Sequence, residues 1–343
     1  MPLILIHSER FALHVTPPGH PERPERAEAM DVVAARFREA GGTIEPPSPA
    51  TRDQLARVHD PRYIDAIAST SGRAVALDPD TFTSPDSYTI ALEAAGAAVA
   101  AVEKAWSGSD RAAFALVRPP GHHAERDRAM GFCLFNNVAV AAAHASTLGA
   151  RRVAIIDYDV HHGNGTQHIF ERDADVLYIS THQYPYYPGT GASDEIGIGP
   201  GAGATVNLPL EAGATDDDYR VVFERVVLPI LRQFAPDLLL VSAGFDAHER
   251  DPLGGMRVTT PAFGAMTQAL RGVADECCRG RIALVTEGGY DLRALAASLE
   301  AAIQAVASPA GAPVWPSSGI ASDRGERSAD ATSAALSGWW KVQ

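Results

Sequence analysis

Short, continuous runs of Val, Ile and Leu alternate with helical patterns along most of the sequence. Such runs are typical of strands that are buried on both faces of a parallel sheet. We expect strands over six ranges: Leu3–Ile6, Ala113–Val117, Val153–Ile156, Val176–Ser180, Leu238–Ser242 and Ile282–Thr286. We expect helices over another six: Pro24–Glu39, Pro85–Trp106, Asn136–Leu148, Asp216–Phe234, Pro261–Ala274 and Leu292–Ala307. This βαβα order predicts an α/β fold with a single doubly wound, mainly parallel sheet and helices on both faces.

The composition changes near residue 308. No Gly/Ser linker and no repeat interrupts residues 1–307, so we expect this span to form one domain. Residues 308–343 are rich in Pro, Ala and Ser, which is typical of a poorly ordered tail. The tail also contains Trp315, Trp339 and Trp340, which suggests that part of it docks onto a surface.

Cysteine usage and the lack of long apolar segments predict a cytoplasmic protein. The sequence has three cysteines, Cys133, Cys277 and Cys278, and none forms a spaced pair of the metal-ligand type. The adjacent Cys277 and Cys278 are poor disulfide partners, which favours a reducing compartment. The N-terminal segment has no basic leader, and no stretch reaches the roughly 20 apolar residues of a membrane span. We therefore expect neither a signal peptide nor a membrane anchor.

The formal net charge of −13 restricts the classes of partner. Binding to nucleic acid depends on clustered Lys and Arg side chains that neutralise phosphates, so we expect no direct nucleic-acid partner. An acidic surface attracts basic peptides and polyamines, although it also simply keeps a protein in solution. The charge does not exclude a homo-oligomer.

The segment after the strand at Val153–Ile156 carries the first candidate metal ligands. Residues 157–164 read DYDVHHGN. Asp159 and His161 are two residues apart, so their side chains project to the same side of an extended chain. A carboxylate and an imidazole in this arrangement can bind one divalent metal ion. Catalytic zinc sites usually have three protein ligands and one open position, so we expect a third ligand elsewhere.

Polar residues also follow three other predicted strands at their carboxyl ends. RPPGHHA follows residues 113–117, AGFDAH follows residues 238–242, and EGGY follows residues 282–286. Ligands of open α/β sheets bind in the crevice beyond the carboxyl ends of the strands, so these segments are expected to meet there. Asp246 is the natural third metal ligand, although an Asp in such a turn can also be a helix N-cap. Two carboxylates and one imidazole suit a divalent ion, and zinc is the first choice.

The adjacent His122 and His123 follow a Pro-Pro-Gly turn and are candidates for acid–base catalysis. Metal-assisted hydrolysis of an amide needs a base to take a proton from water and an acid to protonate the leaving amine. We expect Asp157 and Asn164 to hydrogen-bond the far nitrogens of the two imidazoles. An Asp partner favours an imidazolium, whereas an Asn partner leaves its imidazole closer to neutral, so we expect the two histidines to differ in role.

Aromatic residues complete the set of candidates. Tyr290 follows two glycines, and its hydroxyl could donate a hydrogen bond to an oxyanion that forms opposite the metal. Phe132 and Tyr187 are candidates for the walls of a substrate channel, with core packing as the alternative for Phe132. For His162 we expect packing alone.

Six motifs in one order resemble the zinc-dependent histone deacetylase family. They are RPPGHHA, MGFCLFNNVA, DYDVHHGNGT, YYPGTG, SAGFDAHERDPLGG and EGGY, and the similarity extends from about His20 to Ala307. At the positions of Asn164 and Glu287, the sequence resembles class II deacetylases and bacterial histone deacetylase-like amidohydrolases rather than class I deacetylases. The resemblance implies the arginase/deacetylase-like fold and a catalytic domain over residues 1–307.

The resemblance also implies roles for the residues named above. His123 would act as general base and acid, and His122, backed by Asp157, as its electrostatic partner. Tyr290 would polarise the acyl carbonyl. One zinc ion would be held by Asp159, His161 and Asp246.

A substrate tunnel and structural potassium follow from the same resemblance. The tunnel and its rim would include Asp80, Gly131, Phe132, Tyr187 and Leu253. One potassium site would use the side chain of Asp157, the main chain of Asp159 and His161, and also Ser180 and Thr181. A second would use Phe170, Asp173 and Val176.

We therefore expect a zinc-dependent amidohydrolase that removes acetyl or another short acyl group from the ε-amine of lysine in a peptide or protein. The near alternative is a deacylase of acetylpolyamines or other small amides. Leu253 occupies a position that is acidic in one polyamine-specific branch of the family, which disfavours this alternative without excluding it. A non-catalytic acyl-lysine-binding subunit would not need Tyr290 or both histidines. An arginase-like site with two manganese ions would need Asp157 as an additional ligand, and we disfavour it.

Overall fold

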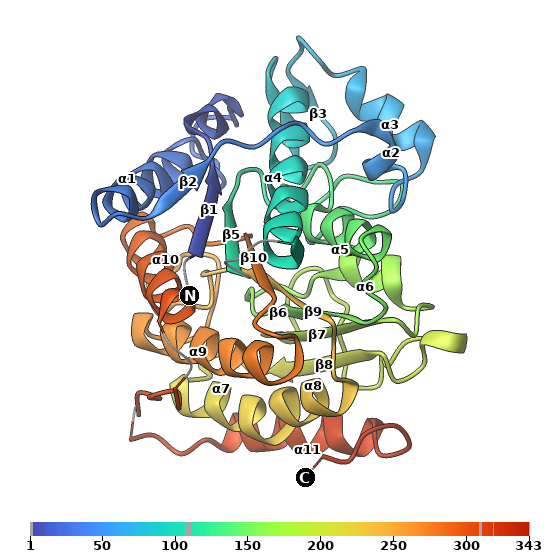
Figure 1. Cartoon of the computed structure of the whole chain (residues 1–343), viewed down its shortest axis with the longest axis vertical. Coiled ribbons are helices and arrows are strands. Elements are labelled where there is room, and N and C mark those ends of the chain that lie inside the picture. The colour runs from blue at the N-terminus through green and yellow to red at the C-terminus, as the bar shows by residue number, and fades with distance from the viewer. Residues whose placement is uncertain (1–2, 108–111, 309–310, 318, 343) are drawn as a thin grey trace.

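Eight strands form one central, wholly parallel sheet in the computed structural model, which describes residues 3–107, 112–308, 311–317 and 319–342 (Figure 1). Across the sheet the order is β2-β1-β5-β10-β9-β6-β7-β8. Their bounds are β1 (Leu3–His7), β2 (Thr43–Glu45), β5 (Ala112–Leu116), β6 (Val153–Asp157), β7 (Val176–Gln183), β8 (Thr205–Leu210), β9 (Leu238–Ala243) and β10 (Ile282–Thr286). A separate antiparallel pair joins β3 (Val75–Ala76) to β4 (Phe82–Thr83).

Helices cover both faces of the sheet, as Figure 1 shows. One face packs against α1 (Glu25–Glu39), α7 (Asp216–Val222), the π-helical turn η3 (Phe223–Val227), α8 (Leu228–Phe234), α9 (Thr260–Cys277) and α10 (Leu292–Ala307). The other face packs against α3 (Pro61–Ala68), α4 (Ser87–Ser107) and α5 (Asn137–Thr147). The remaining helices are η1 (Glu9–Leu13), α2 (Arg52–Leu55), α6 (Asn164–Phe170), η2 (Gly199–Gly201) and α11 (Asp323–Ala335).

Alternation along the strands creates the two cores. In β1, Leu3 and Leu5 belong to the core under α1 and α10, whereas Ile4 and Ile6 belong to the core under α4 and α5. Successive side chains of a strand point to opposite faces, so a strand that is apolar at every position must be covered on both sides. The prediction of a doubly wound parallel sheet is confirmed.

Side-chain caps set the starts of two helices that flank the carboxyl edge of the sheet. The side chain of Asn136 accepts a hydrogen bond from the N–H of Ala139 at the start of α5. The side chain of Asp291 accepts one from the N–H of Ala294 at the start of α10. Each cap satisfies a helix N–H that has no partner within the helix. The chain therefore leaves the sheet edge and enters each helix at a defined residue.

The predicted elements are present, with a few differences. The range expected to be one helix, Asp216–Phe234, contains α7, η3 and α8 in succession. The expected set lacked the edge strands β2 and β8. β2 has only three residues, and β8 contains Asn207 and Pro209, which weaken an apolar strand pattern.

The C-terminal segment corrects one expectation. Residues 323–335 form α11, which packs against α7 and β8, so a poorly ordered tail is wrong for this stretch. The hydroxyl of Thr332 donates to the carbonyl of Asn207 at 2.7 Å, and the indole N–H of Trp340 donates to the carbonyl of Gly203 at 2.7 Å. These hydrogen bonds tie the segment to β8 and to the residues before it, despite its low apolar content. Tail residues 309, 310, 318 and 343 lie outside the described residues.

Within the ranges that the structure describes, no helix is both long enough and apolar enough to cross a membrane.

Candidate metal-dependent catalytic site

The candidate residues follow four strands that are neighbours in the sheet, β5, β10, β9 and β6. Because these strands are parallel, their carboxyl ends lie at one edge, and the segments after them meet there. The order in the sheet differs from the order in the chain, so residues more than 100 positions apart become neighbours. All four polar segments identified from the sequence contribute to this edge.

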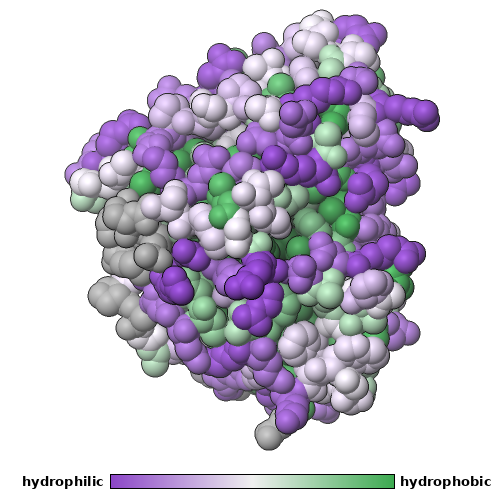
Figure 2. All heavy atoms as spheres, turned by 45° about the vertical axis from the view of Figure 1, so that its right-hand side comes forward, coloured by the Kyte–Doolittle hydropathy of each residue, from purple (hydrophilic) through white to green (hydrophobic). Residues whose placement is uncertain are grey.

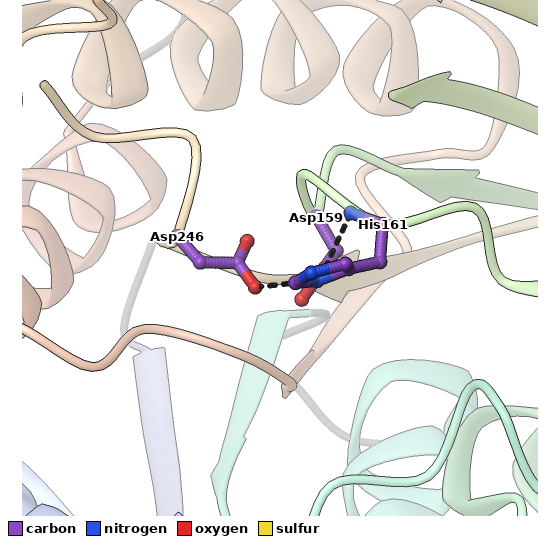
Figure 3. Close-up of side chains that lie close together, drawn as sticks. All are labelled: Asp159, His161 and Asp246. Carbon is purple, nitrogen blue, oxygen red and sulfur yellow. Dashed lines mark hydrogen bonds and ion pairs between the residues drawn. The ribbon is translucent and has the colours of Figure 1, made fainter. Parts of the chain in front are cut away.

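Asp159, His161 and Asp246 form a buried cluster (Figure 3). Nδ1 of His161 lies 3.1 Å from Oδ1 of Asp159 and 3.1 Å from Oδ2 of Asp246. One nitrogen and two carboxylate oxygens thus converge within 4.8 Å of one another, and among the described residues no other group of His, Cys, Asp and Glu does so. This donor set and spacing suit a divalent cation such as zinc.

Backbone groups and glycines fix the two carboxylates. The N–H of Gly288 donates to Oδ2 of Asp159 at 2.8 Å, and the N–H of Val160 donates to Oδ1 of Asp246 at 2.7 Å. A Cβ on Gly244 would lie 2.0 Å from Oδ2 of Asp159, and a Cβ on Gly288 would lie 2.1 Å from Oδ2 of Asp246. Glycine is therefore required at both positions for the carboxylates to reach the cluster.

The charge balance of the cluster also fits a cation. Burial opposes the charge of His161, but Asp159 and Asp246 raise its pKa to about 10. Burial and the neighbouring Asp159 raise the pKa of Asp246 to about 7. Two carboxylates this close together need a positive charge between them, which the imidazolium of His161 supplies here. A divalent ion held by the two carboxylates and the neutral imidazole would supply that charge instead.

His122 and His123 lie side by side, with ring centroids 4.1 Å apart, and each has the partner expected from the sequence. Nδ1 of His122 is 2.9 Å from Oδ2 of Asp157. Nδ1 of His123 is 2.7 Å from Oδ1 of Asn164. Both rings are buried, so the nature of each partner has a strong effect on the charge of the ring.

The two histidines have opposite pKa shifts. Burial lowers the pKa of His122, but the carboxylates of Asp157 and Asp159 outweigh it and raise this pKa well above 6.5. Burial and the positive charges of His122 and His161 lower the pKa of His123 well below 6.5. His122 is therefore an imidazolium near neutral pH, whereas His123 is neutral and able to accept a proton.

The hydroxyl of Tyr290 remains protonated. Burial raises the pKa of Tyr290 well above 10, despite the opposing charge of Arg26. The Arg26 guanidinium lies 5.0 Å from the centroid of the Tyr290 ring. Its Nε donates to the carbonyl of Gly289 at 2.7 Å, which holds the segment that presents the tyrosine. Tyr290 is thus a hydrogen-bond donor in a fixed position.

A narrow pocket of about 110 Å³ leads to these groups. Its wall contains all five residues predicted for the substrate tunnel, together with His122, His123, His161 and Tyr290. The tunnel residues are Asp80, Gly131, Phe132, Tyr187 and Leu253. The exposed surface on the face turned forward in Figure 2 is mainly hydrophilic around a hollow that carries hydrophobic residues.

Aromatic rings shape the pocket. The Tyr187 ring lies edge-on to His123, with centroids 5.1 Å apart, and the Phe132 ring lies edge-on to Tyr290 at 5.8 Å. Tyr186, which had no predicted role, stacks on His161 at 5.6 Å and also lines the pocket. These apolar walls suit an alkyl chain that carries an amide to the histidines and Tyr290.

Residues expected at the first potassium site lie close together on β6 and β7. Asp157 and Ser180 are register partners on β6 and β7. The hydroxyl of the adjacent Thr181 is buried without a hydrogen-bond partner. Phe170, Asp173 and Val176, expected at the second site, lie in the turn from α6 to β7, where the N–H of Asp173 donates to the carbonyl of Phe170.

His162 is part of a buried polar network. Its Nδ1 lies 2.7 Å from the hydroxyl of Thr190, and its Nε2 lies 2.9 Å from Oε1 of Gln167. The network fixes the segment after Tyr187, so His162 has hydrogen-bonding contacts in addition to packing.

Several residues around the site had no predicted role. Asp251 accepts hydrogen bonds from the N–H groups of Tyr290 at 2.6 Å and Leu253 at 2.9 Å. Glu125 accepts one from the Asn164 side chain at 2.6 Å. Asp251 lies inside the motif SAGFDAHERDPLGG and Glu125 directly follows the motif RPPGHHA, yet the identity of their partners depends on contacts between distant segments. An acidic residue in or next to a motif was the only signal that the sequence offered.

Comparisons with known proteins identify the family to which the chain is similar. The histone deacetylase domain family matches residues 20–306. The chain is 44% identical over 311 residues to histone deacetylase 15 of Arabidopsis thaliana, an alignment that covers 88% of this chain but only 54% of that protein. It is 41% identical over 290 residues to the histone deacetylase-like amidohydrolase of Pseudomonas aeruginosa, covering 80% of this chain and 74% of that protein. The crystal structure of the HDA15 HD domain superposes with a TM-score of 0.91 at 40% identity, covering 99% of this chain and 97% of that chain.

Proposed function

This chain belongs to the histone deacetylase family, and from that premise we propose that it is a zinc-dependent amidohydrolase that removes acetyl or another short acyl group from the ε-amine of lysine. The observation that carries the proposal is the convergence of four groups on one narrow pocket. These groups are a buried metal-binding cluster, a neutral histidine, a cationic histidine and a tyrosine hydroxyl. A module that only binds acyl-lysine has no use for a pair of histidines with opposite pKa shifts.

Asp159, His161 and Asp246 would hold the zinc ion, which when bound would polarise the acyl carbonyl and the attacking water. His123, neutral because its pKa is lowered, accepts a proton at Nε2 from the water. His122 supplies positive charge that stabilises the negative charge developing on oxygen as water adds to the carbonyl carbon. The Tyr290 hydroxyl donates a hydrogen bond to the carbonyl oxygen. His123 then returns its proton to the nitrogen of the leaving amine.

The lining of the pocket supports a lysine side chain, rather than a free polyamine, as the substrate that we propose. Its walls are rings, from Phe132, Tyr186 and Tyr187, which suit the apolar stem of lysine. Leu253 at the rim offers no charge to a distant ammonium group. Asp80, also at the rim, could accept hydrogen bonds from the backbone of a bound peptide. An acylated lysine within a peptide or protein is therefore the substrate class that we propose.

A comparison of rates tests this function. Zinc-loaded protein is given acetyl-lysine peptides, longer acyl-lysine peptides and acetylated polyamines at matched concentrations. We expect the highest kcat/KM for a short acyl-lysine peptide. A higher kcat/KM for free polyamines would contradict the proposal that the substrate is an acylated lysine in a peptide or protein. If none of the substrates is hydrolysed, the proposal that the chain is an amidohydrolase is wrong. Asp246→Ala should lose both bound zinc and turnover, whereas Tyr290→Phe should retain zinc but lose kcat by roughly 10²–10³-fold.

We also propose that the Asp157–Thr181 region binds a structural potassium ion. The unpartnered, buried hydroxyl of Thr181 supports this, because a buried polar atom without a partner is costly unless a ligand satisfies it. The melting temperature in potassium chloride should exceed that in tetramethylammonium chloride at equal ionic strength. Equal melting temperatures in the two salts would argue against the site.

A further inference from the structure

We propose that Glu125 is a positioning residue that fixes the orientation of the Asn164 side-chain amide and, through it, the tautomer of His123. The inference rests on the proposed function in one respect, which is that His123 takes and returns a proton. Glu125 lies two residues after His123, and its side chain is only 10% exposed. No catalytic step described above uses this carboxylate.

The surroundings of Asn164 determine which way its amide points. Nδ2 of Asn164 faces three acceptors, which are Oε1 of Glu125 at 2.6 Å, the sulfur of Met130 at 3.4 Å and the carbonyl of His123 at 3.4 Å. An amide nitrogen only donates hydrogen bonds and an amide oxygen only accepts them. The nitrogen must therefore point toward Glu125, which leaves Oδ1 to face His123.

This orientation dictates where His123 carries its proton. Oδ1 of Asn164 lies 2.7 Å from Nδ1 of His123 and can only accept, so Nδ1 of the neutral ring must be the protonated nitrogen. Nε2 then has a free lone pair, as a general base requires. If the amide were reversed, its NH₂ group would face Nδ1 and favour the tautomer with the proton on Nε2. That tautomer cannot accept a proton from water.

Of the three acceptors, Glu125 has the greatest effect on the amide. It is the closest to Nδ2 and the only charged one, and charge-assisted hydrogen bonds are roughly twice as strong as neutral ones. The two sides of an Asn amide are nearly equal in size, so packing alone discriminates poorly between them. Without Glu125, only the two contacts at 3.4 Å would oppose reversal.

Helix α6 holds the Glu125 carboxylate in place. Asn164 and His168 are four residues apart on α6, so they lie on the same side of the helix. Nδ1 of His168 lies 2.9 Å from the same oxygen, Oε1, that accepts from Asn164. His168 thus holds the carboxylate independently of Asn164, which explains how a loop residue can impose a fixed orientation on the amide.

Two substitutions of Glu125 separate the hydrogen bond from the space that the side chain fills. Glu125→Gln keeps an acceptor oxygen, and we expect kcat to remain within about fivefold of the unmodified enzyme. Glu125→Met has a similar length but offers no comparable acceptor, and we expect kcat to fall by about 30-fold or more with KM changed less than about threefold. Glu93→Met is the matched control, because Glu93 is equally buried in α4 and pairs with Arg10 rather than with a site residue.

The Asn164→Asp background tests whether Glu125 acts through the amide. An aspartate accepts a hydrogen bond with either oxygen, so its orientation cannot be reversed. In this background Glu125→Met should change kcat by less than about threefold, or raise it by removing a neighbouring negative charge. If Glu125→Met costs the same factor in both backgrounds, the proposal is wrong.

Long-range ¹H–¹⁵N correlation spectra of the histidine rings give a test that needs no turnover. In the zinc-loaded protein, His123 should show the tautomer protonated at Nδ1, and Glu125→Met should convert a measurable fraction to the tautomer protonated at Nε2. The His123 signals are assigned by their loss in His123→Ala. An unchanged tautomer in Glu125→Met overturns the proposal. If the tautomer changes but no substrate is hydrolysed by the unmodified protein, the positioning role stands and the proposed function fails.

Discussion

At the scale of single residues, the identity of one hydrogen-bonding atom separates the roles of two adjacent histidines. His122 and His123 share burial and backbone environment, but a carboxylate contacts one ring and an amide oxygen contacts the other. A carboxylate stabilises the imidazolium, and a neutral oxygen does so far less. The positive charge of His122 then lowers the pKa of its neighbour further. Two identical side chains thereby obtain opposite pKa shifts, which favour the cation at His122 and the neutral ring at His123.

Replacing the amide that contacts His123 with a carboxylate should shift the pH dependence of kcat/KM. Asn164→Asp places a carboxylate against Nδ1 of His123 and raises the pKa of that ring. In the native protein this pKa is lowered well below 6.5, so the base form persists to acidic pH. In the variant the base form is lost at a higher pH, and the acid limb of kcat/KM should move up by about 1–2 pH units. An acid limb that stays in place or moves down would contradict the assignment of His123 as the base.

The sequence predicts the residues at the site better than it predicts the residues that hold them. Asp159, His161 and Asp246 are recognisable because their side-chain chemistry and their place after a strand carry the signal. Asp251 and Glu125 act on backbone N–H groups or on an amide, and any carboxylate in the right place would do so. Which N–H they meet depends on how the loops fold against one another, and that information is not local in the sequence.

At the scale of elements, the loop after β9 positions the residue that follows β10. Oδ2 of Asp251 accepts from the N–H groups of Tyr290 at 2.6 Å and Asp291 at 3.3 Å, while Oδ1 accepts from Leu253 at 2.9 Å. One carboxylate therefore links the rim of the pocket to the tyrosine and to the cap of α10.

Asp251→Asn should break one of the two links that the Asp251 carboxylate makes. An amide has one acceptor atom, so one of the two sets of N–H groups must lose its partner. We expect kcat to fall by roughly 10–100-fold because Tyr290 shifts, while bound zinc is retained. Asp237→Asn is a matched control, since Oδ2 of Asp237 accepts from the N–H groups of Arg151 and Arg152 before β6, at the opposite edge of the sheet. A loss of kcat in the control as large as that in Asp251→Asn would mean that the effect is general destabilisation.

Central and edge elements differ in how well the sequence predicts them. β10 spans the predicted residues because all five are buried and apolar or small, and flanking residues end the pattern. β8 pairs with one neighbour only, so it tolerates Asn207 and Pro209 and its pattern resembles a loop. Helix α6 is too short to show a helical period, and it begins at Asn164, whose side chain contacts His123.

At the scale of the whole molecule, the segment after residue 308 is part of the folded structure. Composition suggests disorder because α11 is mostly small and polar residues. Small residues, however, allow close packing, and Gly325 and Ala329 are buried against the body of the protein. Gly325 donates its N–H to Oδ1 of Asp218 at 2.8 Å in α7, a contact between segments that are 107 residues apart.

Introducing a charge under α11 tests this docking. Ala329→Lys buries an ammonium group, and we expect it to lower the free energy of unfolding by at least about 2 kcal/mol and to expose the tail to protease. Ala331→Lys, on the exposed side of the same helix, should change neither property. Because α11 packs against α7 and β8 rather than against the catalytic segments, kcat should remain within about threefold. If Ala329→Lys is as resistant to protease as the unmodified protein, α11 does not dock as described.

A buried charge cluster connects distant parts of the chain around Glu22. Its carboxylate contacts the guanidinium groups of Arg26 and Arg118, and all three side chains are fully buried. Arg118 donates to the carbonyl of Phe11, and Arg26 donates to the carbonyl of Gly289. The cluster thus ties the N-terminal segment, α1 and the loops after β5 and β10 into one unit. Removing one partner of such a cluster leaves uncompensated charge in the interior.

Glu22→Gln should therefore destabilise the protein in a pH-dependent way. Burial opposes ionisation, but Arg118, His14 and Arg26 outweigh it and hold the pKa of Glu22 well below 4.5. A carboxylate with a lowered pKa in the folded state stabilises the protein above the unfolded pKa, and this contribution is lost as the pH falls toward the folded value. At pH 7 we expect the variant to lose about 3–5 kcal/mol of unfolding free energy.

The difference in unfolding free energy between the variant and the unmodified protein, measured by urea unfolding, should shrink as the pH is lowered below about 4.5. Glu300→Gln is the control, because it breaks a solvent-exposed ion pair with Arg36 and should have little effect on stability at any pH. If the loss of unfolding free energy in Glu22→Gln stays constant as the pH is lowered, the charge of Glu22 does not carry the stabilisation.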